Sequence, residues 1–566
     1  MSDISRILIT AKEAILSNLT AINVTGSNIS NVSTPGYTRI RPVFQSVGTR
    51  DASSNQEQIG VKIADIERVY DKFLGSQIVA QDSAVGNASA RNSLLTQVEG
   101  VVNESSGDGI NDALSKFWSA WDNLSVNPSG KAERDVLETA AQNLTGIFNS
   151  RAEELSSIQY SIDQTITDDV DKLNGYLSEM SGMNAEITRI EGAGGQASSL
   201  RDNRMTLLSK ISSIIDINYI ERSDGSLYIY LPASGKTLVE GSNKWQLTTQ
   251  SNSTNANLKD IVFTDDLSNS LNNDITSGEL GGLLDIRDVV LASYIDELNQ
   301  TAAGIINKVN TQHMAGYDQD GNMGGAFFTS TTDTSINMTE ARNMQVSAAI
   351  VADARKIAAS STVNADGDNA TAMATIREDK MYASLGKISI TTGSGSAVGQ
   401  INNIGQAYKN TTSAIALTRG ATSANWTIAN NGGYTSLKVL SADDKSVTLD
   451  LNGNGTADIT LNLSGTWTNS DALSFSLTKK DSTTNIEGYY NAFMAGIGQD
   501  VASSTTALAS EQAIANQRSD QREALSGVSL DEEMLNLIKY QTAYNAAGRL
   551  TTVVSEMMDI LINLGK

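Results

Sequence analysis

The two ends of this 566-residue chain constrain its fold more than any other feature, because each carries a long helical repeat of apolar residues. A spacing of alternating three and four residues predicts an amphipathic helix that packs along another helix. At the N-terminus the repeat consists of Leu8, Ile15, Ile22 and Ile29, with Ile4, Ala11, Asn18 and Thr25 at the seam positions between them. The helix is expected to end before Pro35, since a proline holds the residue before it in extended backbone.

The C-terminus mirrors this pattern. Ser529 and Glu532 have the spacing of a capping box, in which each side chain binds a free amide of the first helical turn. The apolar positions that follow are Tyr540, Ala543, Ala547, Leu550, Val554, Met557, Leu561 and Leu564. Two seams at opposite ends of one chain can bury each other, or they can bury against copies of the chain.

Between the two ends, helical and β character alternate along the chain. Segment 211–279 is expected to be a small β-rich unit, because Asp224-Gly225 separates two β-favouring runs as in a hairpin turn. Segment 327–485 is rich in Ser, Thr, Asn and Gly with short β-type runs, which predicts one or more β-rich domains of the sandwich or barrel type. A helical domain is predicted from residues 65–210, 280–326 and 486–525. Terminal axial helices are predicted from residues 1–64 and 526–566.

The predicted fold class is therefore multidomain mixed α and β, with a helical axial core built from both termini and inserted β-rich domains. A linear string of separate domains is the alternative. The paired seams at the two ends favour the axial core, because each seam needs a partner helix to cover it.

Composition removes several classes of function. Asp and Glu outnumber Lys and Arg by 64 to 41, which gives a net charge of −23 and argues against a nucleic-acid partner. No run of about 18 apolar residues is present, and no basic start precedes an apolar block, so neither membrane insertion nor a cleaved signal peptide is expected. The chain has no cysteine and a single histidine, His313, which excludes thiol chemistry and a two-histidine zinc helix.

No residue pattern predicts a catalytic, metal or cofactor site. The segment from Asp450 to Asp458 has oxygen ligands at calcium-loop spacing, but Leu461 stands where a bidentate glutamate is expected. Turns between strands explain this segment and Asp318–Asn322 more simply. We expect His313 to have a capping or packing role. A carboxylate-pair glycosidase is formally open with 64 acidic residues, although no paired motif singles any of them out.

Four segments carry a resemblance to a known family. They are Ala21–Asn31 with Thr34-Pro35-Gly36-Tyr37, Phe117–Pro128 with Ala132-Glu133-Arg134, Gly281–Asp288 with Asn310–Tyr317, and Ser526–Met534 with Lys539–Tyr544. In these segments the chain resembles the family of bacterial flagellar hook-associated protein 1, the first of two junction proteins between hook and filament. The first segment is shared by flagellar rod, hook and hook-associated proteins in general. The second and third point to the junction protein.

The resemblance implies a structural, non-catalytic subunit without cofactors, exported through the flagellar type III channel without a cleaved signal and located outside the cell. Its implied partners are copies of itself, the hook protein, the second junction protein, and an export chaperone on the C-terminal segment 530–566. The predicted assembly interface comprises Leu8, Ile15, Ile22, Ile29, Tyr540, Leu550, Val554, Met557, Leu561 and Leu564, with Thr34, Pro35, Gly36 and Tyr37 as the family turn motif.

Two alternatives remain at this point. The nearest is another flagellar axial protein, either the hook subunit or the second junction protein, against which residues 117–134 and 281–288 argue. The other is an extracellular adhesive or binding module carried on the β-rich segment 327–485. Binding of that fragment to a glycan or a host surface would distinguish it.

Overall fold

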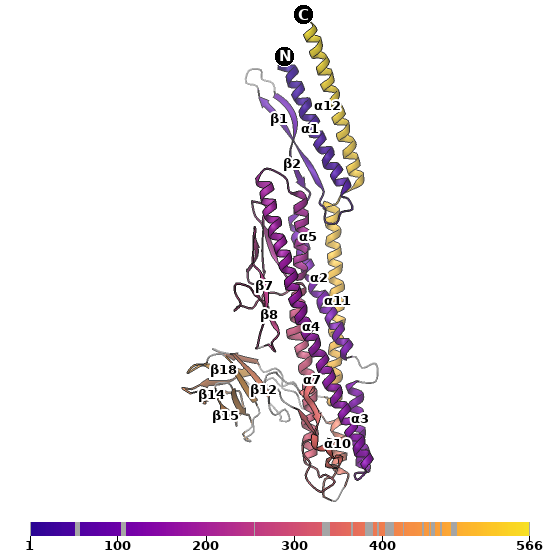
Figure 1. The fold of residues 1–566 in the computed structure, drawn as a ribbon, viewed down its shortest axis with the longest axis vertical. Coiled ribbons are helices and arrows are strands. Elements are labelled where there is room, and N and C mark those ends of the chain that lie inside the picture. Colours follow the sequence, from indigo (N-terminus) through magenta and orange to yellow (C-terminus); the bar gives the residue numbers. More distant parts are fainter. Residues whose placement is uncertain are drawn as a thin grey trace.

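The computed structural model shows an elongated molecule with both chain ends at one extremity and a β domain projecting from the side near the other (Figure 1). The described residues are 2–50, 57–102, 109–253, 255–330, 340–363, 366–379, 389–392, 396–401, 413–422, 424–443, 446–451, 453, 459–464, 467–476 and 484–564. Helices dominate, and small antiparallel sheets are attached to them. The prediction of a multidomain mixed α and β fold is confirmed.

Both termini contribute to one terminal unit. Helix α1 (Ser2–Ser30) and helix α12 (Leu530–Leu564) lie side by side and antiparallel, and a hairpin of β1 (Ile40–Arg50) and β2 (Glu57–Arg68) packs on α1 (Figure 1). The first helix ends at Ser30, before Pro35 as expected, but the rest of the range assigned to terminal axial helices, 1–64, contains strands that were not predicted. The hairpin was missed because its alternating pattern, the period of a strand, was not recognised next to a strong helical repeat.

The body is a bundle of long helices with one continuous apolar core. Its helices are α2 (Lys72–Val102), α3 (Ile110–Val126), α4 (Lys131–Gly192), α5 (Ser198–Ile214), α6 (Gly278–Asp285), α7 (Leu291–Met314) and α11 (Ile486–Ser526). The aromatic residues Phe117, Trp118 and Trp121 of α3 are fully buried in this core. They pack the bundle, as the helical spacing of this segment indicates.

A π-helical turn, Ile286–Val290, joins α6 to α7 and turns Arg287 into the core. The guanidinium donates to Asp163 on α4 at 2.8 Å and to both carboxylate oxygens of Asp288, at 2.7 and 2.8 Å. Gln159 binds the Arg287 carbonyl at 2.9 Å. In α6, a Cβ added at Gly282 would lie 2.8 Å from the Asn87 carbonyl of α2. The Gly281–Asp288 segment thus permits close helix contact and holds a buried ion pair.

Two small antiparallel units lie against α4. One sheet has the order β3 (Asn218–Glu221), β4 (Leu227–Tyr230), β5 (Thr237–Glu240) and β6 (Asn243–Lys244), and the other pairs β7 (Leu247–Ser251) with β8 (Lys259–Phe263). Gly225 has a φ of +81° at the predicted turn between β3 and β4. Segment 211–279 thus contains the strands expected from its sequence.

Segment 327–485 contains two different structures. Short elements extend the helical bundle: β9 (Phe328–Ser330), α8 (Glu340–Asn343), β10 (Met344–Val346), α9 (Ala348–Ala352) and α10 (Asp368–Thr375). The expectation of β structure is wrong for α8, α9 and α10, because helices of one or two turns are too short for a periodic signal. Met373 and Ile376 bury their side chains in the core of the bundle.

The described strands between Ser389 and Ser476 form the projecting β domain, with two four-stranded antiparallel sheets and its own apolar core. One sheet has the order β11 (Ser389–Thr392), β18 (Ala472–Ser476), β13 (Ile415–Arg419) and β14 (Trp426–Asn431). The other has the order β12 (Ser396–Ile401), β17 (Ile459–Ser464), β16 (Ser446–Asp450) and β15 (Lys438–Ala442).

The single histidine is a core residue. His313 is 1% exposed, its Nδ1 lies 2.7 Å from the Gly325 carbonyl, and its Nε2 accepts the Ala358 amide at 2.8 Å. These partners require a neutral ring with the proton on Nδ1. Burial lowers the pKa of His313 to about 4. Both ring nitrogens of His313 are engaged in hydrogen bonds within the core, so neither is available as a base.

This burial predicts a pH dependence of stability. The pKa of His313 is lower in the folded chain than in the unfolded chain, so the unfolded chain binds more protons between about pH 4 and pH 6.5. The contribution of His313 is therefore complete above pH 6.5, and roughly 3 kcal/mol is lost as the pH falls toward 4. Urea unfolding across this range should show that the wild type loses about 3 kcal/mol more stability than His313→Gln as the pH falls. Parallel curves would contradict the prediction.

One described helical segment, Arg6–Ser30 of α1, has the length and composition of a membrane-crossing helix. A helix that packs on other helices can pass the same test. In the structure this segment packs against α12 and β2, and it buries Ser17, Thr25 and Asn28. Ser17 also donates to the Val61 carbonyl of β2 at 3.0 Å. These polar contacts fit a helix whose neighbours are protein.

Candidate assembly interface

The buried side chains of α1 and α12 are mainly small. Ala11, Ala21 and Val24 of α1 are buried, as are Ala547 and Val554 of α12. Small residues let two helix backbones approach closely, so this stripe faces inward. The seam therefore follows the positions of Ala11 and Thr25, and the large aliphatic residues of α1 lie beside it.

The predicted interface residues fall into three groups in the structure. Val554 is buried in the seam, and Ile15, Ile22, Ile29 and Tyr540 are half-buried. Leu8, Leu550 and Met557 are exposed by 40%, 42% and 48%. The side chains of Leu561 and Leu564 lie outside the described residues. Within the single chain Leu8, Leu550 and Met557 are thus not buried by the partner helix, and their part in an assembly interface stays a prediction.

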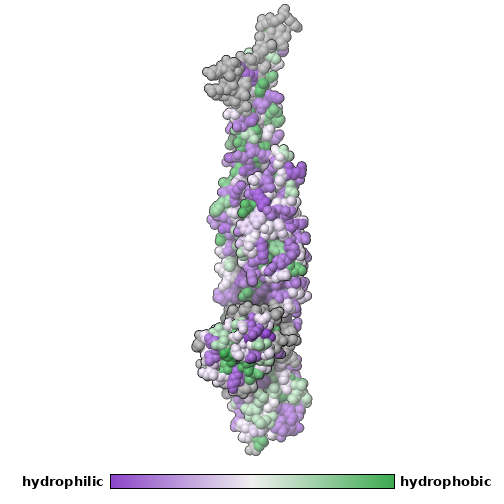
Figure 2. Space-filling model, turned by 90° about the vertical axis from the view of Figure 1, so that its left-hand side faces the viewer, coloured by the Kyte–Doolittle hydropathy of each residue, from purple (hydrophilic) through white to green (hydrophobic). Residues whose placement is uncertain are grey.

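Much apolar surface remains uncovered on the terminal unit, where green side chains are visible in Figure 2. The exposed large apolar residues are Ile7, Leu8, Ile9, Leu16 and Leu19 on α1, Phe44 and Val61 on the hairpin, and Leu530, Met534, Leu535, Ile538, Leu550, Val553, Met557, Met558 and Ile560 on α12. Apolar surface concentrated in this way marks a site of interaction with other protein.

The turn motif after α1 brings the chain back against the helix end. Gly36 has a φ of +82°, and a Cβ at this position would lie 2.8 Å from the Thr206 hydroxyl of α5. Glycine therefore satisfies both the backbone and the space. Thr34 donates its hydroxyl to the Asn31 side chain at 3.3 Å, and Pro35 is exposed. Tyr37 donates to the Asn28 side chain at 2.9 Å.

A buried polar network joins the two ends of the chain. Asn28 of α1 donates to Glu533 of α12 at 3.1 Å, and Glu533 also accepts from Arg39 at 2.8 Å. Asn28 and Glu533 are 1% and 2% exposed. Burial, together with the nearby Asp202 and Glu533 carboxylates, raises the pKa of Tyr37, so its hydroxyl remains a neutral donor. The network closes the terminal unit at the end nearest the body.

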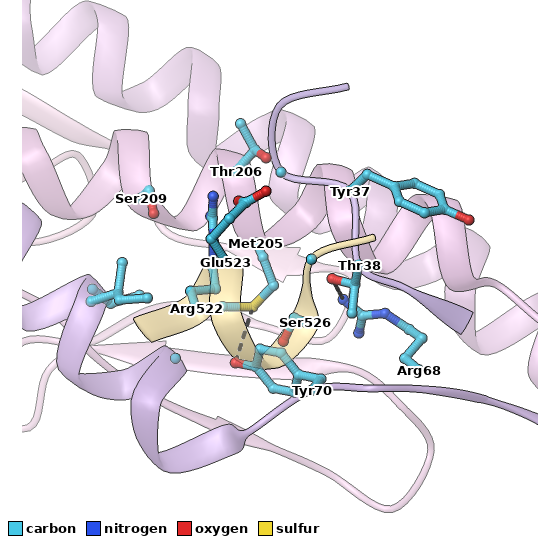
Figure 3. A pocket seen from close by; sticks show the side chains of 15 residues that line it. Tyr37, Thr38, Arg68, Tyr70, Met205, Thr206, Ser209, Arg522, Glu523 and Ser526 are labelled. Carbon is cyan, nitrogen blue, oxygen red and sulfur yellow. Dashed lines mark hydrogen bonds between the residues drawn. The ribbon is translucent and has the colours of Figure 1, made fainter. Parts of the chain in front are cut away.

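The terminal unit is fastened to the body around Asp202 of α5. This carboxylate accepts a hydrogen bond from the Thr38 amide at 3.1 Å, and it forms an ion pair with Arg68 at the end of β2. Beside it lies a cavity of about 50 Å³, lined by residues of the turn, α2, α5 and α11 (Figure 3). Tyr70 points across it to the Met205 sulfur, 3.8 Å away. The cavity has room for water but not for an organic cofactor.

The candidate metal segments do not form a metal centre in the described part of the chain, which contains no group of three or more His, Asp or Glu side chains suited to a metal. Asp318 accepts the amides of Asp320 and Asn322 and pairs with Lys356 at 3.3 Å, so it organises a turn. In the calcium-like segment, Asp450 accepts the Gly453 amide at 2.6 Å. Residues 452 and 454–458 lie outside the described residues.

Three residues of this joint were not found from the sequence: Arg39, Asp202 and Glu533. Arg39 and Glu533 are 494 positions apart, and no local pattern predicts that they meet. Glu533 lies in the acidic first turn of α12, where a negative charge favours the helix dipole. A glutamate that is buried at this position needs a cationic partner. This requirement is the only indication in the sequence that an arginine such as Arg39 lies beside Glu533.

Family comparisons agree with this architecture. The model for the flagellar hook-associated protein FlgK helical domain matches residues 95–328. The models for the flagella basal body rod protein and for the flagellar basal body rod FlgEFG protein C-terminal match residues 8–38 and 521–564. The matched termini are the paired helices of the terminal unit. This chain is a structural protein of the bacterial flagellum.

Relatives that match almost the whole chain indicate which flagellar family it belongs to. Flagellar hook-associated protein 1 of Bacillus subtilis is 24% identical, and the alignment covers 98% of this chain and 97% of the relative. The proteins of the same name from Salmonella typhimurium and Escherichia coli are 25% and 24% identical, each over 96% of this chain and 97% of the relative. The chain belongs to the flagellar hook-associated protein 1 family.

A solved structure supports the fold. The flagellar hook junction protein FlgK from Burkholderia pseudomallei superimposes with a TM-score of 0.50 at 16% identity. The match covers 80% of this chain and all of that one. At this identity the likeness concerns the fold alone.

Proposed function

We propose that this chain builds the junction between the flagellar hook and the filament, through contacts that its terminal helices make with neighbouring copies. The observation that carries the proposal is the exposed apolar surface of α1 and α12, on helices that are already paired within the chain. The names of the whole-chain relatives supply the place of assembly. The absence of cysteine and the packing role of His313 support a structural role in place of catalysis.

Coupled ordering and assembly is the proposed mechanism. The buried apolar residues of α1 and α12 are alanines and valines, which bury little apolar area, whereas many of the large aliphatic residues are exposed. In the free chain the terminal helices are loosely held, because this small contact offsets little of the entropy lost on ordering them. In an assembled layer the exposed residues, including Leu8, Leu550 and Met557, become buried against neighbouring subunits.

The partners follow from this position in the flagellum. The chain would sit on the hook protein and carry the second junction protein, after export without a cleaved signal to the outside of the cell. Before export, a chaperone would cover the apolar surface of residues 530–566. The exposed Met534, Leu535 and Ile538 of this segment support the proposal, since such surface would otherwise associate prematurely.

Labelling of intact flagella tests the location. A short epitope in the projecting β domain, detected by gold-labelled antibody, should give one narrow band at the boundary between hook and filament. A continuous coat along the hook would indicate the hook subunit instead. Label restricted to the cell body, or its absence from flagella that are fully built, would overturn the proposal.

A further inference from the structure

We propose that the buried Asn28–Glu533 pair fixes the register in which α1 and α12 meet, and therefore which aliphatic residues the terminal unit presents outward. The inference deepens the proposed function, because register decides the surface that neighbouring copies encounter. It concerns a positioning role for two residues that make no contact with any partner themselves.

The hydrogen bonds of Asn28 are complete in the observed register. Its amide nitrogen donates to the Ile40 carbonyl at 2.8 Å and to Glu533 at 3.1 Å. Its oxygen accepts the Ile40 amide at 3.1 Å and the Tyr37 hydroxyl at 2.9 Å. An asparagine side chain offers two donors and two acceptor sites, so all four are used. The side chain is 1% exposed, and any displaced α12 leaves one donor unpaired away from water.

Glu533 is equally specific to this register. Its carboxylate is 3% exposed and accepts from Asn28 and from Arg39 at 2.8 Å. Arg39 is held in place by its own backbone amide, which donates to the Ser526 carbonyl at 2.9 Å, and by Glu532 at 2.8 Å. The charge of Glu533 is therefore satisfied only where α12 begins beside the turn motif.

The other residues of the seam do little to select one register of α1 and α12. Ala11, Ala21 and Ala547 are small and apolar, and alanine accepts an alanine or valine opposite it at small cost. A slip of one heptad keeps the same faces together, because the seam has a seven-residue repeat. A single buried polar residue in such a seam is a known means of selecting one register.

The observed register predicts which residues of α1 and α12 lie opposite each other. The helices are antiparallel, so Ala14, two heptads before Asn28, lies opposite Ala547, two heptads after Glu533 (Figure 1). Slips of one heptad instead place Ala14 opposite Tyr540 or Val554. Because the chain contains no cysteine, pairs of introduced cysteines report these arrangements without background.

The test uses the purified full chain with Ala14→Cys combined with Ala547→Cys, Tyr540→Cys or Val554→Cys, oxidised in a glutathione buffer. A disulfide traps even a transient pairing, so the readout does not require assembly. The intrachain 14–547 link should exceed each shifted link by about tenfold or more. With Asn28→Ala, this preference should fall to within about threefold. The exposed Asn23→Ala is the matched control and should keep the full preference.

A rescue separates register selection from a general loss of structure. Asn28→Asp places two carboxylates together and should abolish the preference, whereas Asn28→Asp with Glu533→Gln restores a donor and an acceptor and should recover most of it. An unchanged preference in Asn28→Ala would overturn the proposal, as would failure of the double variant to recover. Disulfide formation is measured in the purified chain, whereas the location in the flagellum is tested by labelling. Failure of the register proposal is therefore distinguishable from failure of the proposed function.

Discussion

Replacing Leu550 and Met557 together by aspartate is expected to abolish filament attachment while leaving the fold of the body intact. Both side chains are more than 40% exposed, so their loss removes little contact within the chain. In an assembled layer they are buried, and each aliphatic side chain contributes roughly 1.5–3 kcal/mol. Two buried carboxylates add a larger cost in every subunit. Cells carrying the variant should make hooks without filaments and secrete unpolymerised flagellin.

The control is Leu267→Asp, which changes a leucine of the body exposed by 54%. It should leave swimming and filament length normal. Urea unfolding followed by circular dichroism should give both variants the stability of the wild type, because neither alters the bundle core. Normal filaments on cells carrying the Leu550 and Met557 variant would rule out the proposed use of this surface.

Arg287→Met is expected to destabilise the body by about 3–5 kcal/mol, the range observed when one partner of a buried ion pair is removed. Arg287 is fully buried, and Asp163 beside it has a side chain only 3% exposed. Methionine fills similar space but leaves the Asp163 carboxylate without its cation. The Lys259 carbonyl, which accepts from Arg287 at 2.8 Å, loses its donor as well.

Arg189→Met is the matched control, since Arg189 pairs with Glu186 on the same helix at the surface, with both side chains well exposed. Exposed pairs contribute about 0–1 kcal/mol, so this variant should unfold close to the wild type. The measurement is the urea midpoint of the two variants under identical conditions. If Arg287→Met shifted the midpoint no further than Arg189→Met, the buried pair would not hold the π-helical turn in the way described.

The sequence predicted the long elements well, because their apolar periods extend over many turns. The capping box predicted the start of the terminal helix at Ser529 and Glu532, and in the structure α11 ends at Ser526 and the Ser529 hydroxyl lies 3.5 Å from the Glu532 amide. The chain's family was predicted from short motifs and is confirmed. Repeated local patterns of this kind need no knowledge of tertiary contacts.

What the sequence did not predict depends on contacts between distant residues. The β1–β2 hairpin has no tight Asn-Gly or Asp-Gly turn to mark it, and the helices α8, α9 and α10, of one or two turns each, are too short to show a period. The predicted seam combined the row of Leu8 and Ile15 with the row of Ala11 and Thr25, and the structure buries the second row more completely. Both stripes have a seven-residue repeat, so periodicity alone could not choose between them.

Hydrogen exchange of the terminal helices tests the central claim most directly. Amides of residues 1–30 and 535–566 should exchange fast in the purified chain and become strongly protected in isolated hook–junction particles. Helix α4, buried in the body, serves as an internal reference that is protected in both. Strong protection of both termini in the free chain, unchanged on assembly, would contradict the account.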